Sequence, residues 1–178
     1  MTMRTIAEWL TPVKASGLAA YLIASVACAA TATRASQKRL RRLAAALCAI
    51  DLGLLLDIAF NWRWKLYDSL KEDAMSHPWY YERSGPQIAA LLSLSIVLLV
   101  AAVFLSHKFA SVRGAPLAVC GGLLSIGCWL TEIVSLHATD AVLYRSVGPL
   151  MVISFVWLLA CLMTAVGVLM AAGGSLAD

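Results

Sequence analysis

The sequence predicts an all-α, polytopic membrane protein: a bundle of five transmembrane helices preceded by a short interfacial N-terminal segment. Three observations support this prediction. Apolar residues make up 61% of the 178 residues and charged residues only 13%, whereas soluble chains are about 45–50% apolar and about 25% charged. The mean hydropathy is +0.82. Apolar stretches of about 20 residues, the length that crosses a bilayer, recur along the chain. We expect a single membrane domain over residues 1–178.

The N-terminal region predicts an interfacial segment followed by a close-packing helix. Residues 1–12 carry Trp9 and apolar neighbours at helical spacing, which is typical of a segment lying at the headgroup level. The first span is expected over residues 15–33. Within it Ala20, Ala24 and Cys28 lie four apart, and such a stripe of small residues allows another helix to approach closely.

A basic segment follows the first span. Residues 34–42 contain five Lys or Arg residues and no acid. Such a cluster beside a membrane helix is typical of a cytoplasmic loop that touches anionic lipid headgroups. A nine-residue loop between two spans offers little surface for a duplex, so we expect no nucleic-acid partner.

The second span is expected over residues 43–60 and carries two acids. Asp51 lies near its centre, where insertion costs about 2.5–3.5 kcal/mol. Asp57 points about 120° away from it. The helix is expected to continue past the membrane, because Asp57, Asn61, Trp64 and Asp68 fall on one helical stripe. It would end before Pro78, inside an extracytoplasmic loop over residues 61–86.

Three further spans complete the predicted bundle. Ser84, Gly85 and Pro86 form a helix start for a charge-free third span over residues 88–106. The fourth, over residues 115–136, has a slim face of small residues. The small residues of this fourth span are Gly121, Gly122, Ser125 and Gly127. Gly148 and Pro149 are expected to open the fifth span, over residues 148–172.

The cysteines predict no redox chemistry. All five lie inside apolar stretches and none belongs to a CxxC pair. This placement argues against a disulfide framework and favours small apolar residues at helix contacts.

Loop charge sets the expected orientation. The side that holds residues 34–42 and 107–115 has short basic loops close to the membrane, so we expect it to be cytoplasmic. The N-terminus would then lie outside and the C-terminus in the cytoplasm, in a membrane of the bacterial inner-membrane type.

This topology brings the polar candidates, apart from Asp51 and the basic loops, to the extracytoplasmic end. Ionisable groups at a membrane helix end need partners. One interpretation is mutual satisfaction, in which Asp57 or Glu132 pairs with Arg63 or Arg145 and tyrosine hydroxyls complete the network. Another is a pocket for the polar head of a quinone or lipid. Its candidate residues are Asp57, Asn61, Arg63, Glu132, His137, Asp140, Tyr144 and Arg145.

Two other functions stay open. His137 and Asp140 can share a helical face, and with His77 they could serve a metal-dependent enzyme that acts on a lipid. Asp51 could carry protons in a small coupled transporter. We expect an interaction or ligand-binding subunit of a membrane complex. Its partners would be membrane lipid and other membrane subunits or further copies of itself, with quinone or lipid ahead of a metal as the small molecule.

Overall fold

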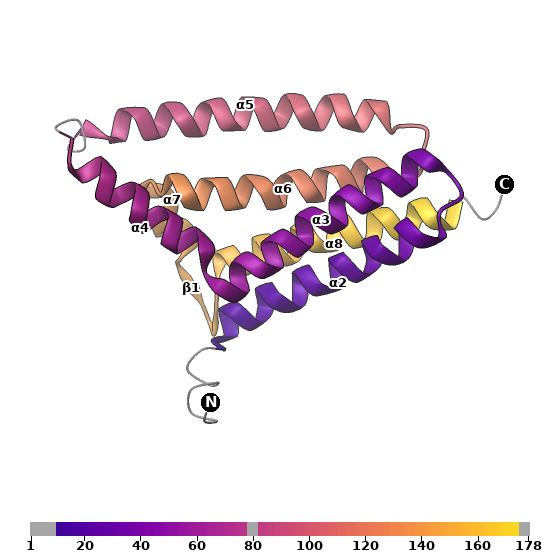
Figure 1. The fold of residues 1–178 in the computed structure, drawn as a ribbon, viewed down its shortest axis with the longest axis horizontal. Coiled ribbons are helices and arrows are strands. Elements are labelled where there is room, and N and C mark those ends of the chain that lie inside the picture. Colours follow the sequence, from indigo (N-terminus) through magenta and orange to yellow (C-terminus); the bar gives the residue numbers. More distant parts are fainter. Residues whose placement is uncertain (1–9, 78–81, 175–178) are drawn as a thin grey trace.

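The computed structural model describes residues 10–77 and 82–174 and shows an almost entirely helical chain (Figure 1). Five of its helices are long and apolar enough to cross a membrane, which confirms the predicted bundle. The predicted interfacial segment falls largely on residues 1–9, outside the described residues. The elements are α2 (Pro12–Arg34), α3 (Lys38–Phe60), α4 (Trp62–Met75), α5 (Ser84–Lys108), α6 (Ala115–Val134), α7 (His137–Leu143), β1 (Ser146–Val147), β2 (Leu150–Met151) and α8 (Val152–Gly174).

Helices α2, α3, α6 and α8 form the packed core. Helix α2 lies along both α3 and α8, and α8 also lies along α6. The predicted small-residue stripe of α2 is confirmed, since Ala20, Ala24 and Cys28 are all buried. Helices without long side chains at their contact can pack backbone against backbone, and dispersion contacts then hold the bundle in lipid.

Glycines set the contact between α6 and α8. A Cβ atom built on Gly121 would lie 2.6 Å from the Ala160 carbonyl oxygen, and one on Gly167 would lie 2.4 Å from the Ala118 backbone nitrogen. Real Cβ atoms do not approach other atoms so closely, so at each of these contacts a glycine of one helix lies directly against the backbone of the other. The predicted slim face of the fourth span is therefore confirmed.

Helix α5 stands outside this core. Figure 1 shows it running beside α6 at one edge of the molecule, and α6 is the helix along which it packs. None of its residues is buried among the described part of the chain. The charge-free third span is thus a peripheral helix, with most of its surface available to lipid or to another protein.

The predicted continuation of the second helix through Asn61 is wrong. Asn61 has φ 55° and ψ 39°, in the left-handed region that asparagine tolerates better than most residues. The helix breaks there, and α4 starts with a new direction at Trp62 (Figure 1). Asp57 stabilises the break, because its Oδ1 accepts the backbone N–H of Arg63 at 2.7 Å. That N–H belongs to the first turn of α4 and would otherwise lack a helical partner.

The predicted start of the fifth span at Gly148 is also wrong. Gly148 and Pro149 form the turn of a small antiparallel hairpin in which Ser146 pairs with Met151. Gly148 has φ 64°, a conformation that two-residue hairpin turns require and that glycine adopts without strain. Helix α8 begins only after the hairpin, at Val152.

The two ends of the bundle differ in charge. The basic end contains the α2–α3 and α5–α6 connections, and residues 34–42 and 107–115 comprise these connections and the adjoining helix ends. The opposite end contains α4, α7 and the hairpin. We call it the network end, because it holds the buried ionic network described below.

Candidate functional site

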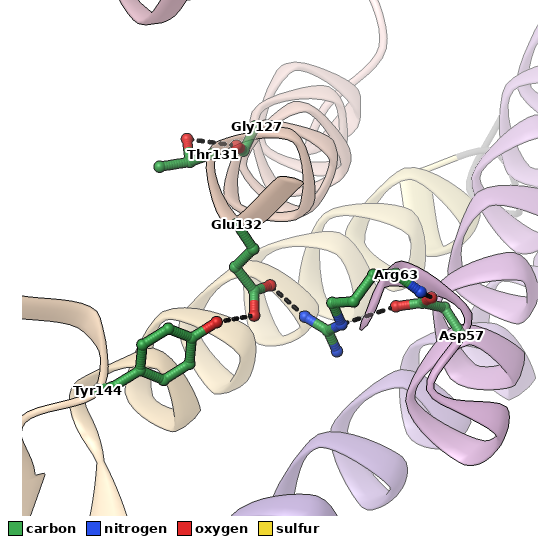
Figure 2. A network of polar contacts seen from close by, with 6 residues as sticks. All are labelled: Asp57, Arg63, Gly127, Thr131, Glu132 and Tyr144. Atoms are coloured by element: carbon green, nitrogen blue, oxygen red, sulfur yellow. Dashed lines mark hydrogen bonds and ion pairs between the residues drawn. The ribbon is translucent and has the colours of Figure 1, made fainter. Parts of the chain in front are cut away.

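Four of the predicted site residues form one buried network. The Arg63 guanidinium lies between two carboxylates (Figure 2): its Nε is 2.9 Å from Asp57 Oδ2, and its Nη1 donates to Glu132 Oε2. The Tyr144 hydroxyl donates to the other oxygen of Glu132 at 3.0 Å. We call Asp57, Arg63, Glu132 and Tyr144 the Arg63 network. The predicted pairing of acids with Arg63 and a tyrosine hydroxyl is therefore confirmed.

The network ties four parts of the chain together. Asp57 lies in the last turn of α3, and the Asn61 turn directs Arg63 of α4 back towards it. Glu132 comes from the last turn of α6, and Tyr144 follows α7. The Arg63 guanidinium carbon also lies 5.3 Å from the ring centroid of Trp157 in α8, within the range of a cation–π contact.

Burial makes the pairing necessary. The side chains of Asp57, Arg63 and Glu132 are only 6%, 8% and 2% exposed. A charge held out of water is costly unless it is paired and hydrogen-bonded. Two carboxyl groups share one guanidinium here, so the Tyr144 hydroxyl and the Arg63 backbone N–H supply the remaining donors. Both oxygens of Glu132 are consequently engaged inside the protein.

A cavity of about 390 Å³ lies against the network. Its floor includes Arg63 and Glu132, and Ile58, Ile153 and Trp157 supply apolar and aromatic wall. Ligand pockets generally have volumes of about 300–1,000 Å³ and combine apolar walls with few polar groups. The remaining polar and aromatic residues at its lining are Thr11, Lys14, Asn61, Trp64 and Tyr144.

A second cavity, of about 410 Å³, lies between α3, α4 and α6. Asp57 and Arg63 contribute to its lining, together with Trp62, Leu66 and Trp129. Arg63 thus lines both hollows, of which the first has the more polar lining. We call the first one the network cavity.

The other predicted ligand-binding residues lie apart from the network cavity. Asp140 accepts a hydrogen bond from the Ser135 hydroxyl at 2.6 Å and so fixes the turn between α6 and α7. His137 and Arg145 are exposed. None of these three predicted residues lines the cavity. Their assignment to ligand binding stays a prediction.

The predicted metal ligands do not gather in this structure. Among the described residues, no three His, Cys, Asp or Glu side chains lie close enough together to hold a metal ion. His77, His137 and Asp140 are therefore not such a group.

Asp51 lies deep in the core. It is fully buried, and the Cys28 thiol of α2 is 3.9 Å from its Oδ2. Asp51 lines neither of the two hollows beside Arg63. Its proposed role as a proton carrier stays a prediction.

Lys14 and Trp157 were not predicted from the sequence as site residues, although both line the network cavity. Lys14 lies at the start of a span, where a lysine is ordinarily an interfacial anchor. Trp157 belongs to a charge-free span, so no charged neighbour in the sequence marks it. The one signal in the sequence that could have pointed to this cavity was the position of Lys14, a basic residue at the edge of a predicted span.

Replacing Tyr144 with phenylalanine should lower the free energy of unfolding by about 1.5–3 kcal/mol, the contribution of a hydrogen bond to a charged group. Denaturant titration in mild detergent, followed by circular dichroism, measures the change. Tyr67→Phe is the matched control, because Tyr67 lies on the partly exposed face of α4, and it should change stability little. An equal effect of both substitutions would contradict the role assigned to Tyr144.

Tyr144→Phe should also change how the free energy of unfolding depends on pH in the alkaline range. Burial raises the pKa of the Tyr144 hydroxyl above its usual value, and the Glu132 charge raises it further. A pKa raised on folding stabilises the protein below the unfolded-state value near 10, and this contribution is lost as pH rises above it. Wild type should therefore lose more stability than Tyr144→Phe above about pH 10. Parallel loss in both proteins would contradict this expectation.

Comparisons with protein-family models, with curated proteins and with solved structures found no match to this chain.

Proposed function

We propose that this protein is a ligand-binding subunit of a membrane complex, and that its network cavity receives the polar head of a quinone. The observation that carries the proposal is the cavity of about 390 Å³ between α2, α6, α8 and the Asn61 turn. Its lining combines apolar and aromatic side chains with charged ones. An amphiphile with a flat, polar head and an apolar tail suits such a lining.

The polar lining favours a head that accepts hydrogen bonds. Glu132 already receives Arg63 and Tyr144, so its oxygens are engaged. Donor groups in the lining include the Lys14 ammonium, the Asn61 amide, the Thr11 hydroxyl and the indole N–H groups of Trp64 and Trp157. Quinone carbonyl oxygens are acceptors, and Trp64 and Trp157 offer rings against which a flat head can stack. A lipid ester or phosphate is the alternative acceptor.

The proposed orientation places this cavity on the extracytoplasmic side, with the basic end in the cytoplasm. The outer face of α5 would then remain for a partner subunit or for lipid. Leu92, Ile96 and Val103 on that face are each more than 60% exposed.

Tryptophan fluorescence tests the proposal, because two of the lining residues are tryptophans. Titrating a benzoquinone with a decyl tail into protein in mild detergent should quench the emission saturably. Lys14→Met and Asn61→Gly should each raise the dissociation constant by about 2- to 12-fold, the equivalent of one hydrogen bond. Glycine at position 61 keeps the left-handed backbone and removes only the amide.

Matched controls separate the cavity from general quenching. Lys65→Met removes a lysine from the exposed face of α4, and Trp62→Phe removes a tryptophan that lines the second hollow instead. Both should leave the dissociation constant unchanged. Non-saturable quenching, or saturable quenching that Lys14→Met and Asn61→Gly leave untouched, would overturn the proposal. Competition by added phospholipid would identify a lipid as the occupant.

A further inference from the structure

A large hollow lies near the basic end, away from the Arg63 network. It is a groove of about 650 Å³ between α3, α5 and α6. It exists because α5 packs along α6 without lying along α3 (Figure 1), so α3 and α5 leave a space over α6. Gly122 of α6, at the floor of the groove, lets Leu47 of α3 approach closely. We call this hollow the α3–α5 groove.

Three cations lie at one end of the α3–α5 groove. Arg39 and Arg42 come from the first two turns of α3, and Lys108 is the last residue of α5. All three are exposed. Among the described residues that line the groove, none is acidic. The cations thus provide a local positive charge that no lining side chain neutralises.

Below the cations the groove is apolar. Leu43, Ala46, Leu47 and Ile50 line it along one face of α3. Ile50 lies eleven residues after Arg39, and at 1.5 Å per residue this separation corresponds to about 16 Å. One leaflet of a bilayer has a hydrocarbon thickness of about 15 Å, half of the whole core. The groove therefore extends from headgroup level to about the bilayer centre.

We propose that the α3–α5 groove binds one anionic phospholipid of the leaflet at the basic end. Its phosphate would lie among Arg39, Arg42 and Lys108, and one acyl chain would fill the space between α3 and α5. Cations above an apolar, leaflet-long wall match the charge and the length of such a lipid. An apolar helix of a partner would leave the three cations without counter-charge. The site is separate from the network cavity and does not depend on its ligand.

Native mass spectrometry of the full chain in mild detergent tests this proposal. Palmitoyl-oleoyl phosphatidylglycerol is the probe, and the phosphatidylcholine with the same chains is the neutral comparison. Wild type should retain one phosphatidylglycerol in preference to phosphatidylcholine. The triple variant Arg39→Gln, Arg42→Gln, Lys108→Gln should lose affinity for phosphatidylglycerol by about fivefold for each cation removed.

A matched variant removes three positive charges from the same end of the bundle. Lys38→Gln, Arg41→Gln and Arg113→Gln change three exposed cations of the basic end that do not line the groove. This variant should bind phosphatidylglycerol as wild type does. Equal loss in both triple variants would show diffuse attraction to the basic end and would overturn the proposal. Displacement of the lipid by glycerol phosphate alone would do so too, because it would mean that the acyl chain contributes nothing.

Two single tryptophan substitutions test the apolar part of the α3–α5 groove. Ala46 lines the groove, whereas its exposed neighbour Ala45 does not. Ala46→Trp should fill the groove and abolish lipid retention, and Ala45→Trp should leave it intact. Helical circular dichroism before each measurement shows that both variants are folded. Retention unaffected by Ala46→Trp would place the lipid elsewhere and would overturn the proposal.

Discussion

Replacing Arg63 with methionine should lower the free energy of unfolding by about 3–5 kcal/mol, the usual effect of removing one partner from a buried ion pair. The substitution leaves Asp57 and Glu132 buried with no cation between them, and it removes the contact with Trp157. Denaturant titration in mild detergent measures the change. Arg145→Met is the matched control, since Arg145 is exposed at the same end, and it should have little effect.

A triple variant distinguishes the effect of the unpaired charges from the effect of the lost Arg63 side-chain contacts. Combining Arg63→Met with Asp57→Asn and Glu132→Gln removes all three charges together, so most of the lost stability should return. If the triple variant is as unstable as Arg63→Met alone, the unpaired carboxylates are not the cause. The hydrogen-bonding geometry of the guanidinium would then be the dominant contribution.

Replacing Gly167 with leucine should prevent α6 and α8 from packing. The new Cβ would lie 2.4 Å from the Ala118 nitrogen and 2.7 Å from the Gly114 carbonyl oxygen. Both atoms belong to backbone, which cannot rotate away as a side chain does. Overpacking typically costs about 1–3 kcal/mol and more where nothing can yield. We therefore expect a loss of about 3 kcal/mol or more in the free energy of unfolding, measured by thermal unfolding in detergent.

Gly53→Leu is the matched control for this substitution. Gly53 lies within α3, and a Cβ built there would meet no atom within 4 Å. Leucine has the higher helix propensity, so the control should be neutral or slightly stabilising. Equal destabilisation by both substitutions would indicate a general intolerance of bulk, in contradiction to a specific contact between α6 and α8.

The sequence was a good guide to the spans and to the network. Five apolar stretches predict five crossings because length and hydropathy decide whether a helix can lie in lipid. The pairing of Asp57 and Glu132 with Arg63 was predictable, since buried charges in membranes seek partners. The close-packing role of Gly121 was equally visible, because small residues are what helix contacts in lipid require.

Local backbone geometry was the part that periodicity could not predict. Asn61 continues a regular helical stripe, and only its left-handed conformation reveals that the chain turns there. Gly148 and Pro149 suit a helix start as well as a hairpin turn, and the pairing of Ser146 with Met151 decides between them. The place of Lys14 in the network cavity depends on how α2 meets α8. These two helices lie far apart in the sequence, so their contact has no local signature.

The sequence separation within the Arg63 network sets an order of events during biogenesis. Chains emerge from the ribosome N-terminus first. Asp57 precedes Arg63 by six residues, so this pair can form as soon as the turn after α3 closes. Glu132 follows 69 residues later and enters the bilayer within α6. Arg63 is synthesised well before that acid, so the Asp57–Arg63 pair can form first and Glu132 can join it afterwards.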